Sequence, residues 1–574
     1  MKNKIYRDEY PNYQFRRENY QILNGLWDFI IDNDNKYSVK QILKRQRFKK
    51  INVPFAPEAK LSLINHKDFI KHCYYKKEIE LVKDNNLLFI NFNAVDYEAT
   101  LYVNGIEIGT HKGGYTPFKF EISKYIVNGK NSFVLHVTDE NLTNQARGKQ
   151  SYLKDSFGCF YTRTTGIWQS VWLEKVPQAY IENVKFKAVK GKKAVNIDLN
   201  TNTSGTVNFL ITYKNKEMAN ITAICNKHLN INVNLLEKHL WDINKGNLYD
   251  IKISFENDVV YSYFGLRFID IKENILYLNN KPIFQRLVLD QGYYEDGIYT
   301  AKDVTEFKKD IMLSKRLGFN GARLHQKVFE SNFLYECDKQ GYIVWGEYPS
   351  WGIDFKDCTY LSQFKNEWQE EIERDYSHPS IITWCPLNEV WEVNEYKSNR
   401  DVNFLKEAYK FTKELDKTRP CVDASGGFHC NDTDIFDIHN YQWDESFKKH
   451  IDALNNNEIT FANALAPSKY NESYKYLNQP IIISEFGGMK LKNSTSGWGY
   501  NDVSLTNDEF VKTYTYLVDL MLNCNKIVGF CYTQLYDVEQ EMNGLYTYKR
   551  KNKLSNEEVK AIKKANISKA SVEK

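Results

Sequence analysis

The sequence predicts a multidomain protein of the β plus α/β class, in which two β-sandwiches precede a (β/α)₈ (TIM) barrel. The chain has 574 residues, more than a single hydrophobic core organises. Its first half reads as short strands of alternating polarity separated by turn residues, whereas strand and helix patterns alternate after Phe268. The latter part contains eight strand candidates, the number that closes a barrel. The expected domains are 1–176, 177–267 and 268–574.

Composition excludes several classes of protein. The chain carries 77 basic and 73 acidic residues, and this near balance gives no reason to expect a nucleic acid or a membrane surface as partner. The ten cysteines form no CxxC pair, so reduced and mostly buried thiols are expected. The N-terminus lacks the apolar stretch of a signal peptide, and no run is long enough for a membrane helix. The expected location is therefore the cytoplasm.

The region from about 20 to 176 has the pattern of an antiparallel sandwich. Asn104-Gly105 separates two alternating stretches and favours a two-residue hairpin turn. Strands are also predicted at Leu87–Phe92, Ser132–Val137 and Ser170–Glu174. Pro177 marks the expected boundary.

Residues 178 to about 267 are predicted to form a smaller β-sandwich without catalytic residues. Its strands are expected at Ala194–Leu199, Thr206–Tyr213 and Leu248–Phe255.

The barrel strands are short and apolar and are followed by amphipathic helices. Asp303 is the predicted cap of the first helix, which Gly318 ends, and further helices are expected at Asn399–Lys417 and Asn507–Asn523. The eight strands are expected at Ile283–Leu289, Gly321–Leu324, Ile343–Trp345, Ile381–Trp384, Cys421–Ala424, Ile435–Ile438, Ile481–Ser484 and Ile527–Cys531.

Polar side chains follow these strands, and in a barrel the carboxyl ends of all strands open onto one mouth. Glu389 and Glu485 each follow a buried strand, which makes them the candidate pair of catalytic carboxyl groups. A Ser-His-Asp arrangement, a Walker loop and a GxGxxG fingerprint are absent from the sequence. The other candidates, expected to bind a hydroxyl-rich substrate, are Asp290, Arg323, His325, Asn388, His439, Tyr441, Gln534 and Asp537.

Some of these residues have alternative roles. Arg323 is as well suited to hold neighbouring carboxylates as to contact a sugar, and Glu347 is expected to support the site rather than to react. His325 and His439 could bind a metal, but no HExxH motif accompanies them, and hydrogen bonding to hydroxyls is preferred.

Over nearly its whole length the chain resembles glycoside hydrolase family 2, which includes β-galactosidases, β-glucuronidases and β-mannosidases. The segment from Val95-Asp96-Tyr97 to Thr116-Pro117-Phe118 is similar to the family's jelly-roll sugar-binding domain. Phe264-Gly265-Leu266-Arg267 is similar to the end of its immunoglobulin-like domain. The most specific matches are Asn388-Glu389 and Ser484-Glu485-Phe486-Gly487-Gly488.

The resemblance implies a retaining exo-β-glycosidase acting on small β-linked saccharides. Glu485 would be the nucleophile and Glu389 the acid/base, with their carboxyl groups about 5 to 5.5 Å apart. Asn388 would hold the sugar's 2-hydroxyl, and Tyr441 stands where the family has a tyrosine near the nucleophile. No organic cofactor is implied; relatives bind Mg²⁺ or Na⁺, but no ligand set can be assembled here. A homo-oligomer is compatible with the resemblance.

Three departures from the family pattern bear on the sugar. Asp290 stands near the position where many members end the first strand in His-Glu, and Phe160 replaces a sugar-contacting Asp. Glu541-Met542-Asn543 replaces the Asn-x-Lys with which β-glucuronidases hold a carboxylate. A neutral sugar, first a β-galactoside, is therefore expected. The alternatives are a β-glucuronidase, another specificity such as an arabinopyranosidase, and an inactive carbohydrate-binding protein.

Overall fold

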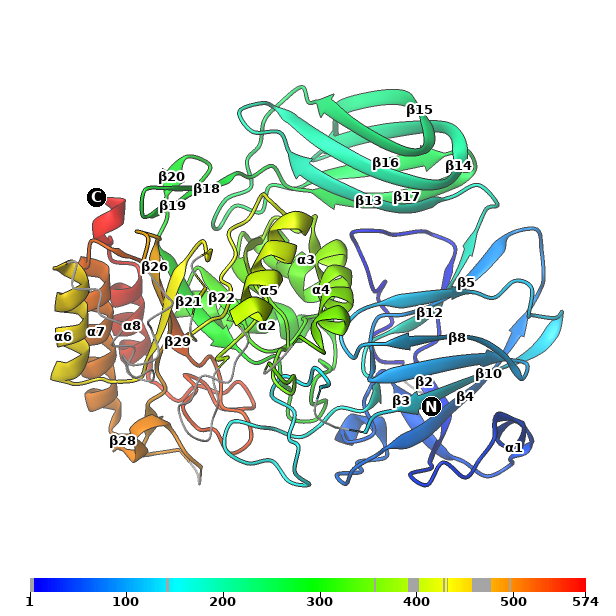
Figure 1. Ribbon diagram of the computed structural model, residues 1–574, viewed down its shortest axis with the longest axis horizontal. Coiled ribbons are helices and arrows are strands. Elements are labelled where there is room, and N and C mark those ends of the chain that lie inside the picture. The colour runs from blue at the N-terminus through cyan, green and yellow to red at the C-terminus, as the bar shows by residue number, and fades with distance from the viewer. Residues whose placement is uncertain are drawn as a thin grey trace.

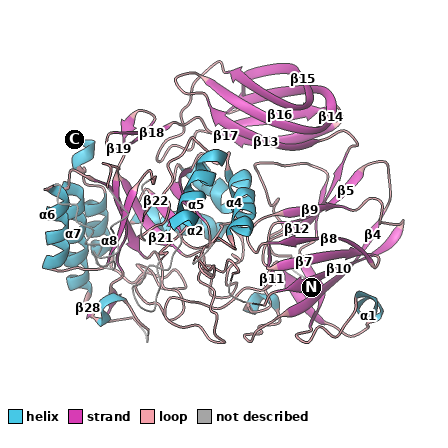
Figure 2. Cartoon of the chain, viewed as in Figure 1, coloured by secondary structure: helices cyan, strands magenta, loops and turns pink. Residues whose placement is uncertain are grey.

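The computed structural model describes residues 5–140, 144–355, 358–390, 402–426, 429–430, 432–456, 476–494 and 497–574. Figure 1 shows a β-sandwich at the N-terminal side, a smaller sandwich above it, and a barrel with outer helices that forms the remaining half. Figure 2 shows that nearly all helices belong to the barrel. No described helix has the length and apolar composition needed to span a membrane.

The first sandwich consists of two antiparallel sheets around one core, as predicted. The turn at Asn104-Gly105 has positive φ at both residues and joins β7 to β8. Trp27, Phe29 and Phe133 lie in the core between the sheets. One sheet has the order β1 (Tyr20–Ile22), β12 (Val171–Val176), β5 (Leu87–Phe92), β9 (Phe118–Glu121). The other has the order β3 (Lys49–Val53), β2 (Gly25–Ile31), β4 (His72–Leu81), β10 (Gly129–Thr138), β7 (Glu98–Val103), β8 (Ile106–Lys112).

The second sandwich is built from unusually long strands. The stretches predicted at Ala194–Leu199 and Thr206–Tyr213 are one strand, β14, with a register shift between Asn200 and Ser204. Its first half pairs with β13 and its second half with β16, so a single strand serves both sides of the core. The strands are β13 (Ile181–Ala188), β14 (Ala194–Tyr213), β15 (Lys216–Asn234), β16 (Tyr249–Phe255) and β17 (Asp258–Phe264).

The barrel sheet is parallel throughout, with the order β24-β23-β22-β21-β29-β26-β25. Leu276 and Leu278 of a small hairpin pack with Leu287 and Trp345 and close its amino-terminal end. The strands are β21 (Gln285–Asp290), β22 (Gly321–Leu324), β23 (Ile343–Glu347), β24 (Ile381–Cys385), β25 (Phe436–Asn440), β26 (Ile481–Gly487) and β29 (Ile527–Thr533). The hairpin strands are β18 (Ile269–Lys272), β19 (Ile275–Leu278) and β20 (Lys281–Pro282).

The helices follow the predicted pattern. Asp303 accepts a hydrogen bond from the N–H of Thr305 at the start of α2, and Gly318 follows its end with φ +88°. Of the helix predicted at Asn399–Lys417, residues 399–401 lie outside the described part. The helices around the barrel are α2 (Val304–Arg316), α3 (Ser331–Gln340), α4 (Leu361–Asp375), α5 (Val402–Leu415), α6 (Glu445–Asn455), α7 (Asn507–Asn523) and α8 (Asn556–Asn566).

The fifth predicted strand, Cys421–Ala424, is not a regular strand. It joins β24 through isolated bridges, with the N–H of Val422 donating to the carbonyl of Trp384. The carboxylate of Asp423 lies 2.6 Å from Nδ1 of His429 and accepts from the N–H of Cys430. These side-chain bonds fold the segment into a loop in place of a continuous ladder, while the bridges still close the barrel beside β24.

Candidate active site

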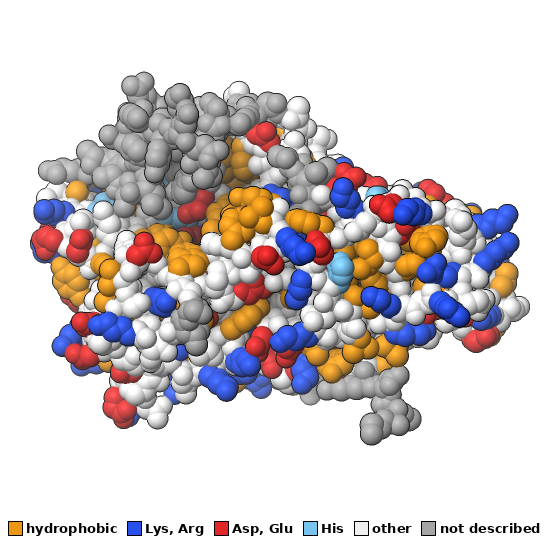
Figure 3. All heavy atoms as spheres, turned by 90° about the horizontal axis from the view of Figure 1, so that it is seen from below, with side chains coloured by type: hydrophobic (Ala, Val, Ile, Leu, Met, Phe, Trp, Pro, Cys, Tyr) orange, Lys and Arg blue, Asp and Glu red, His pale blue; other side chains and the backbone are white. Residues whose placement is uncertain are grey.

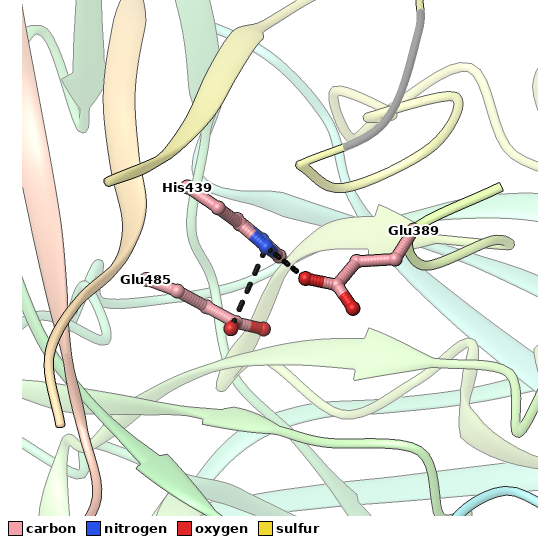
Figure 4. A group of neighbouring side chains, drawn as sticks. All are labelled: Glu389, His439 and Glu485. Atoms are coloured by element: carbon pink, nitrogen blue, oxygen red, sulfur yellow. Dashed lines mark hydrogen bonds and ion pairs between the residues drawn. The ribbon is translucent and has the colours of Figure 1, made fainter. Parts of the chain in front are cut away.

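The two predicted catalytic acids face each other at the carboxyl end of the barrel (Figure 4). Glu485 belongs to β26, and Glu389 lies four residues beyond β24 with a positive φ of 47°. A carboxylate oxygen from each and a ring nitrogen of His439 lie within 4.8 Å of one another. This spacing is close to the separation of carboxyl groups in retaining glycosidases and shorter than that in inverting ones.

Local strand geometry sets this arrangement. His439 of β25 is the register partner of Glu485 of β26, and each residue lies at an irregularity of the parallel ladder. Such irregularities redirect side chains and are common beside active sites. Here the two side chains lie next to each other on neighbouring strands.

Arg323 of β22 connects the groups around Glu485. It is fully buried and donates through Nε to Glu347 at 2.6 Å and through Nη1 to Glu485 at 2.8 Å. Its Nη2 donates to Oδ1 of Asn388 at 2.5 Å. One planar guanidinium therefore fixes side chains that follow three other strands, as expected for a bidentate donor in a low-dielectric site.

The surroundings of Glu485 favour its ionised form. Burial, the largest effect, disfavours the charge, but His439 and Arg323 outweigh it and lower the pKa of Glu485 to about 2. Its second oxygen accepts a short hydrogen bond from the hydroxyl of Tyr441. Glu485 is thus a carboxylate over the working pH range, the state that a nucleophile requires.

His439 lies between the two acids and contacts both of them. Its Nδ1 lies 2.7 Å from Oε1 of Glu389, and its Nε2 lies 3.0 Å from the hydroxyl of Ser425. Burial is the largest single effect and by itself would lower the pKa of His439. The carboxylates of Glu485 and Glu389 together outweigh burial, so the pKa of His439 is raised. The ring of His439 therefore links the two carboxyl groups and adds positive charge beside Glu485.

Several buried polar atoms near the pair have no hydrogen-bond partner among the described residues. Asn388 lacks one for Nδ2, and Gln534, whose Nε2 donates to Asn543 at 2.8 Å, lacks one for Oε1. Nδ1 of His325 lies 3.0 Å from a carboxylate oxygen of Glu347, but the angle does not allow a hydrogen bond. Burial holds the pKa of His325 well below its usual value. Such unpaired groups suit a ligand with several hydroxyls, because burial without a partner is costly.

Two residues predicted to bind the sugar, Asp290 and Asp537, lie outside this group and have partners in the barrel wall. Asp290 is the last residue of β21, and its side chain points away from the barrel interior because those of Leu287 and Leu289 point into it. Its carboxylate accepts a hydrogen bond from the hydroxyl of Tyr536 at 2.5 Å. Asp537 forms an ion pair with Lys553 at 2.8 Å and accepts from the N–H of Gly544. Both carboxylates support the barrel wall instead of facing the substrate.

Residues that the sequence did not indicate complete the mouth. Lys149, 6% exposed, comes from the first sandwich and lies 4.8 Å from the ring centre of Trp351. Burial is the largest single effect and by itself would lower the pKa of Lys149. Cys159 and the nearby carboxylates, of which Glu541 has the largest effect, outweigh burial and raise this pKa. No described carboxylate is close enough to form an ion pair with it. Nothing near Lys149 in the sequence indicates this position, since only domain docking brings it to the barrel.

Tyr500 was also missed, and Glu541 was considered only for its bearing on the sugar's charge. Glu541 accepts hydrogen bonds from Tyr161 at 2.5 Å and from Asn543 at 3.0 Å, and Tyr161 belongs to the sandwich. The ring of Tyr500 stacks on Tyr441 with 3.5 Å between centres. The hydrogen bond between Tyr161 and Glu541 thus joins the sandwich domain to the barrel mouth.

The same geometry bears on metal binding. Glu389, His439 and Glu485 form a group whose potential ligand atoms are close enough to share an ion, and within the described residues it stands alone. The guanidinium of Arg323, 2.8 Å from Glu485, already supplies a positive charge that would repel a divalent cation.

A (β/α)₈ barrel with two opposed glutamates at the carboxyl ends of its strands is an arrangement typical of retaining glycoside hydrolases. The chain belongs to glycosyl hydrolases family 2: the model of that family's TIM barrel domain matches residues 269–565, and the model of its sugar-binding domain matches residues 20–177.

Relatives within the family carry different names. A putative beta-glucuronidase of Formosa agariphila is 28% identical over 60% of this chain and 44% of its own length. A beta-galactosidase of Thermoanaerobacterium thermosulfurigenes is 28% identical over 69% of this chain and 57% of its own. A beta-glucuronidase of Streptococcus agalactiae is 24% identical over 85% and 86%. The chain thus spans about half the length of the first two relatives.

Solved structures share the whole fold. A beta-glucuronidase of Bifidobacterium dentium superimposes with a TM-score of 0.80 at 16% identity, covering 98% of this chain and 99% of that one. A GH2 beta-galacturonidase from Eisenbergiella tayi gives 0.76 at 17% identity, with 99% of each chain covered. The predicted fold class is confirmed.

Proposed function

We propose that the protein is a retaining exo-β-glycosidase that hydrolyses terminal β-linked sugars by double displacement. The observation that carries this is the unequal surroundings of two carboxyl groups whose oxygens lie within 4.8 Å of each other: Glu485 accepts hydrogen bonds from Arg323 and Tyr441, whereas Glu389 contacts the ring of His439. A glycosidase needs one carboxylate and one carboxylic acid at this distance.

In the first step Glu485 attacks the anomeric carbon and displaces the leaving oxygen, which takes the proton of Glu389. In the second step Glu389, now a carboxylate, removes a proton from water, and the resulting hydroxide displaces Glu485. The partnerless Nδ2 of Asn388 supports the expected bond to the sugar's 2-hydroxyl. No metal ion is part of this proposal, because Arg323 and His439 supply the positive charge.

For the sugar we propose a neutral pyranoside, first a β-galactoside. Glu541 is buried at the position where β-glucuronidases place Asn-x-Lys, and a carboxylate accepts hydrogen bonds from hydroxyl groups but repels a uronate. One observation favours β-glucuronidase as the second candidate: Lys149 brings an ammonium without an ion-pair partner among the described residues. Relatives with both names fit either choice.

A panel of 4-nitrophenyl β-glycosides tests both proposals. We expect turnover of the galactoside with Glu485→Gln inactive. Turnover of the glucuronide alone would transfer the assignment to the second candidate, and lack of activity on every β-glycoside would refute the proposed reaction. Eight of the ten cysteines are buried thiols, and this supports the further proposal of a cytoplasmic location.

A further inference from the structure

Four aromatic side chains form a continuous surface beside the catalytic pair, here called the aromatic wall: Tyr152, Phe157, Phe160 and Trp351. Phe157 lies 5.1 Å from Tyr152 and 5.2 Å from Phe160, measured between ring centres. Phe160 in turn lies 5.2 Å from Trp351. The first three belong to a loop of the sandwich domain, and Trp351 belongs to the barrel.

The wall is open to solvent. Tyr152 is 46% exposed, and the other three rings are half-buried. Seen from below in Figure 3, on the side where loops follow the barrel strands, hydrophobic side chains gather near the middle of the molecule. Contiguous aromatic rings left exposed next to a site are a common sign of ligand binding.

The wall begins at the acid/base residue. The indole N–H of Trp351 donates to the backbone carbonyl of Asn388 at 3.2 Å, and Glu389 is the next residue. Because Glu389 would protonate the leaving oxygen, the group attached to that oxygen lies on the side of Glu389. The rings therefore extend from the place where the leaving group departs.

The loop that carries the rings is fixed to the barrel. Gln540 donates to the carbonyls of Gly158 and Phe160 at 2.7 and 2.9 Å, and Trp498 donates to Gly158 at 2.8 Å. A loop held by three such bonds presents its rings in a defined position, which limits the entropy lost on binding.

We infer that the aromatic wall binds an aromatic aglycone, so that the natural substrates are β-glycosides of planar phenolic or similar ring compounds. Tyr152 contributes the wall's hydroxyl group and Trp351 its N–H, which is already bonded to Asn388. Two cations lie over ring faces of the wall, Lys149 at 4.8 Å from Trp351 and Arg147 at 5.5 Å from Tyr152. A second sugar would need more polar partners than these, whereas a planar ring gains from stacking and edge contacts with each side chain. This inference rests on the proposed function, since it assigns the leaving group of that reaction.

The test compares two glycosides of the sugar that the substrate panel identifies: one of 2-naphthol and one of an aliphatic alcohol of similar acidity. For Phe157→Ala we expect the ratio of kcat/KM values, naphthyl over alkyl, to fall about tenfold. Inhibition by free 2-naphthol should weaken by a similar factor. The control is Leu153→Ala, which removes a 49% exposed side chain from the same loop. It should change neither the ratio of kcat/KM values nor the inhibition by 2-naphthol.

The outcomes are distinct. An unchanged ratio in Phe157→Ala, or a wild-type preference for a disaccharide of the same sugar over the naphthyl glycoside, would overturn the inference while leaving the proposed hydrolysis intact. If neither glycoside is hydrolysed by the wild-type protein, the proposed function itself fails. Because Phe157 is half-buried on a surface loop, its replacement leaves the cores of both domains unchanged.

Discussion

Arg323 determines much of the chemistry of the site through its position alone. Its side chain is fully buried and donates to two carboxylates and one amide. A lysine would supply one charge without the planar set of donors, so Arg323→Lys would leave some of these acceptors unpaired. The arginine thereby helps to keep Glu485 ionised.

At the same scale, replacing the acid/base should have an effect that depends on the leaving group. Glu389→Gln removes the proton donor, so kcat for a glycoside of a poor leaving group should fall by about 10² to 10⁴. A dinitrophenyl glycoside needs no protonation and should retain rapid formation of the glycosyl-enzyme. Pre-steady-state kinetics with both substrates measures this difference; an equal loss of the first step for both would contradict the role of Glu389.

Replacing Asp290, unlike replacing Glu389, should leave the rate of hydrolysis unchanged, because the carboxyl group of Asp290 is bonded to Tyr536. Burial, the largest effect, and Asp310 raise the pKa of Asp290 to about 6. The folded state then binds more protons than the unfolded state between about pH 4 and 6, so this group lowers stability as the pH rises through that range. Asp290→Asn should therefore keep kcat and gain stability relative to wild type from pH 4 to 6. Urea unfolding at several pH values tests this, and a large loss of kcat would return Asp290 to the site.

At the scale of elements, the loop after the irregular fifth segment controls the position of His439. Gly426 has φ +61°, and a Cβ added there would lie 2.1 Å from Nδ1 of His439. Since that nitrogen contacts Glu389, a side chain at Gly426 would displace the imidazole ring from Glu389.

We therefore expect Gly426→Ala to reduce kcat by about 10²-fold, as a displacement of about 1 Å in a catalytic group can do. The matched control is Gly191→Ala, where φ is +76° but no atom lies within 4 Å of the added Cβ. Both variants carry comparable backbone strain. Equal kcat values for the two, measured alongside thermal unfolding, would exclude a steric effect on His439.

At the scale of the whole molecule, the site depends on docking of the sandwich against the barrel. Glu367 of α4 accepts from Tyr97 of the sandwich and from Tyr348 of the barrel, both at 2.8 Å. Lys327 lies over Trp168 of the sandwich and Tyr299 of the barrel, at 5.4 and 4.7 Å from the ring centres. These contacts hold the sandwich domain against the barrel. A loop of that domain carries Lys149 and three rings of the aromatic wall.

Lys327 should make this docking sensitive to pH. Burial, the largest effect, lowers the pKa of Lys327 to about 7. Between about pH 7 and 10 the folded state binds fewer protons than the unfolded state, so stability contributed at this position rises with pH, by up to about 1.4 kcal/mol per unit. The free energy of unfolding of wild type minus that of Lys327→Met should increase over this range. Calorimetry at several pH values measures it; a constant difference would mean that Lys327 remains charged.

The sequence by itself determined the fold class and the two glutamates that are proposed to be the catalytic pair. The hairpin at Asn104-Gly105, the cap at Asp303 and the apolar strands before Glu389 and Glu485 are local signals, because turn chemistry, capping and strand burial act within a few residues. The order of strands around a barrel then brings their carboxyl ends together wherever the chain closes.

Only the tertiary structure decided which polar residues join the pair. Asp290 turns outward because alternation along β21 directs it to the helix layer, and Cys421–Ala424 becomes a loop because Asp423 bonds within its own segment. Lys149, Tyr161 and three of the four rings of the aromatic wall reach the mouth from another domain. Such positions depend on contacts across hundreds of residues, which no local pattern encodes.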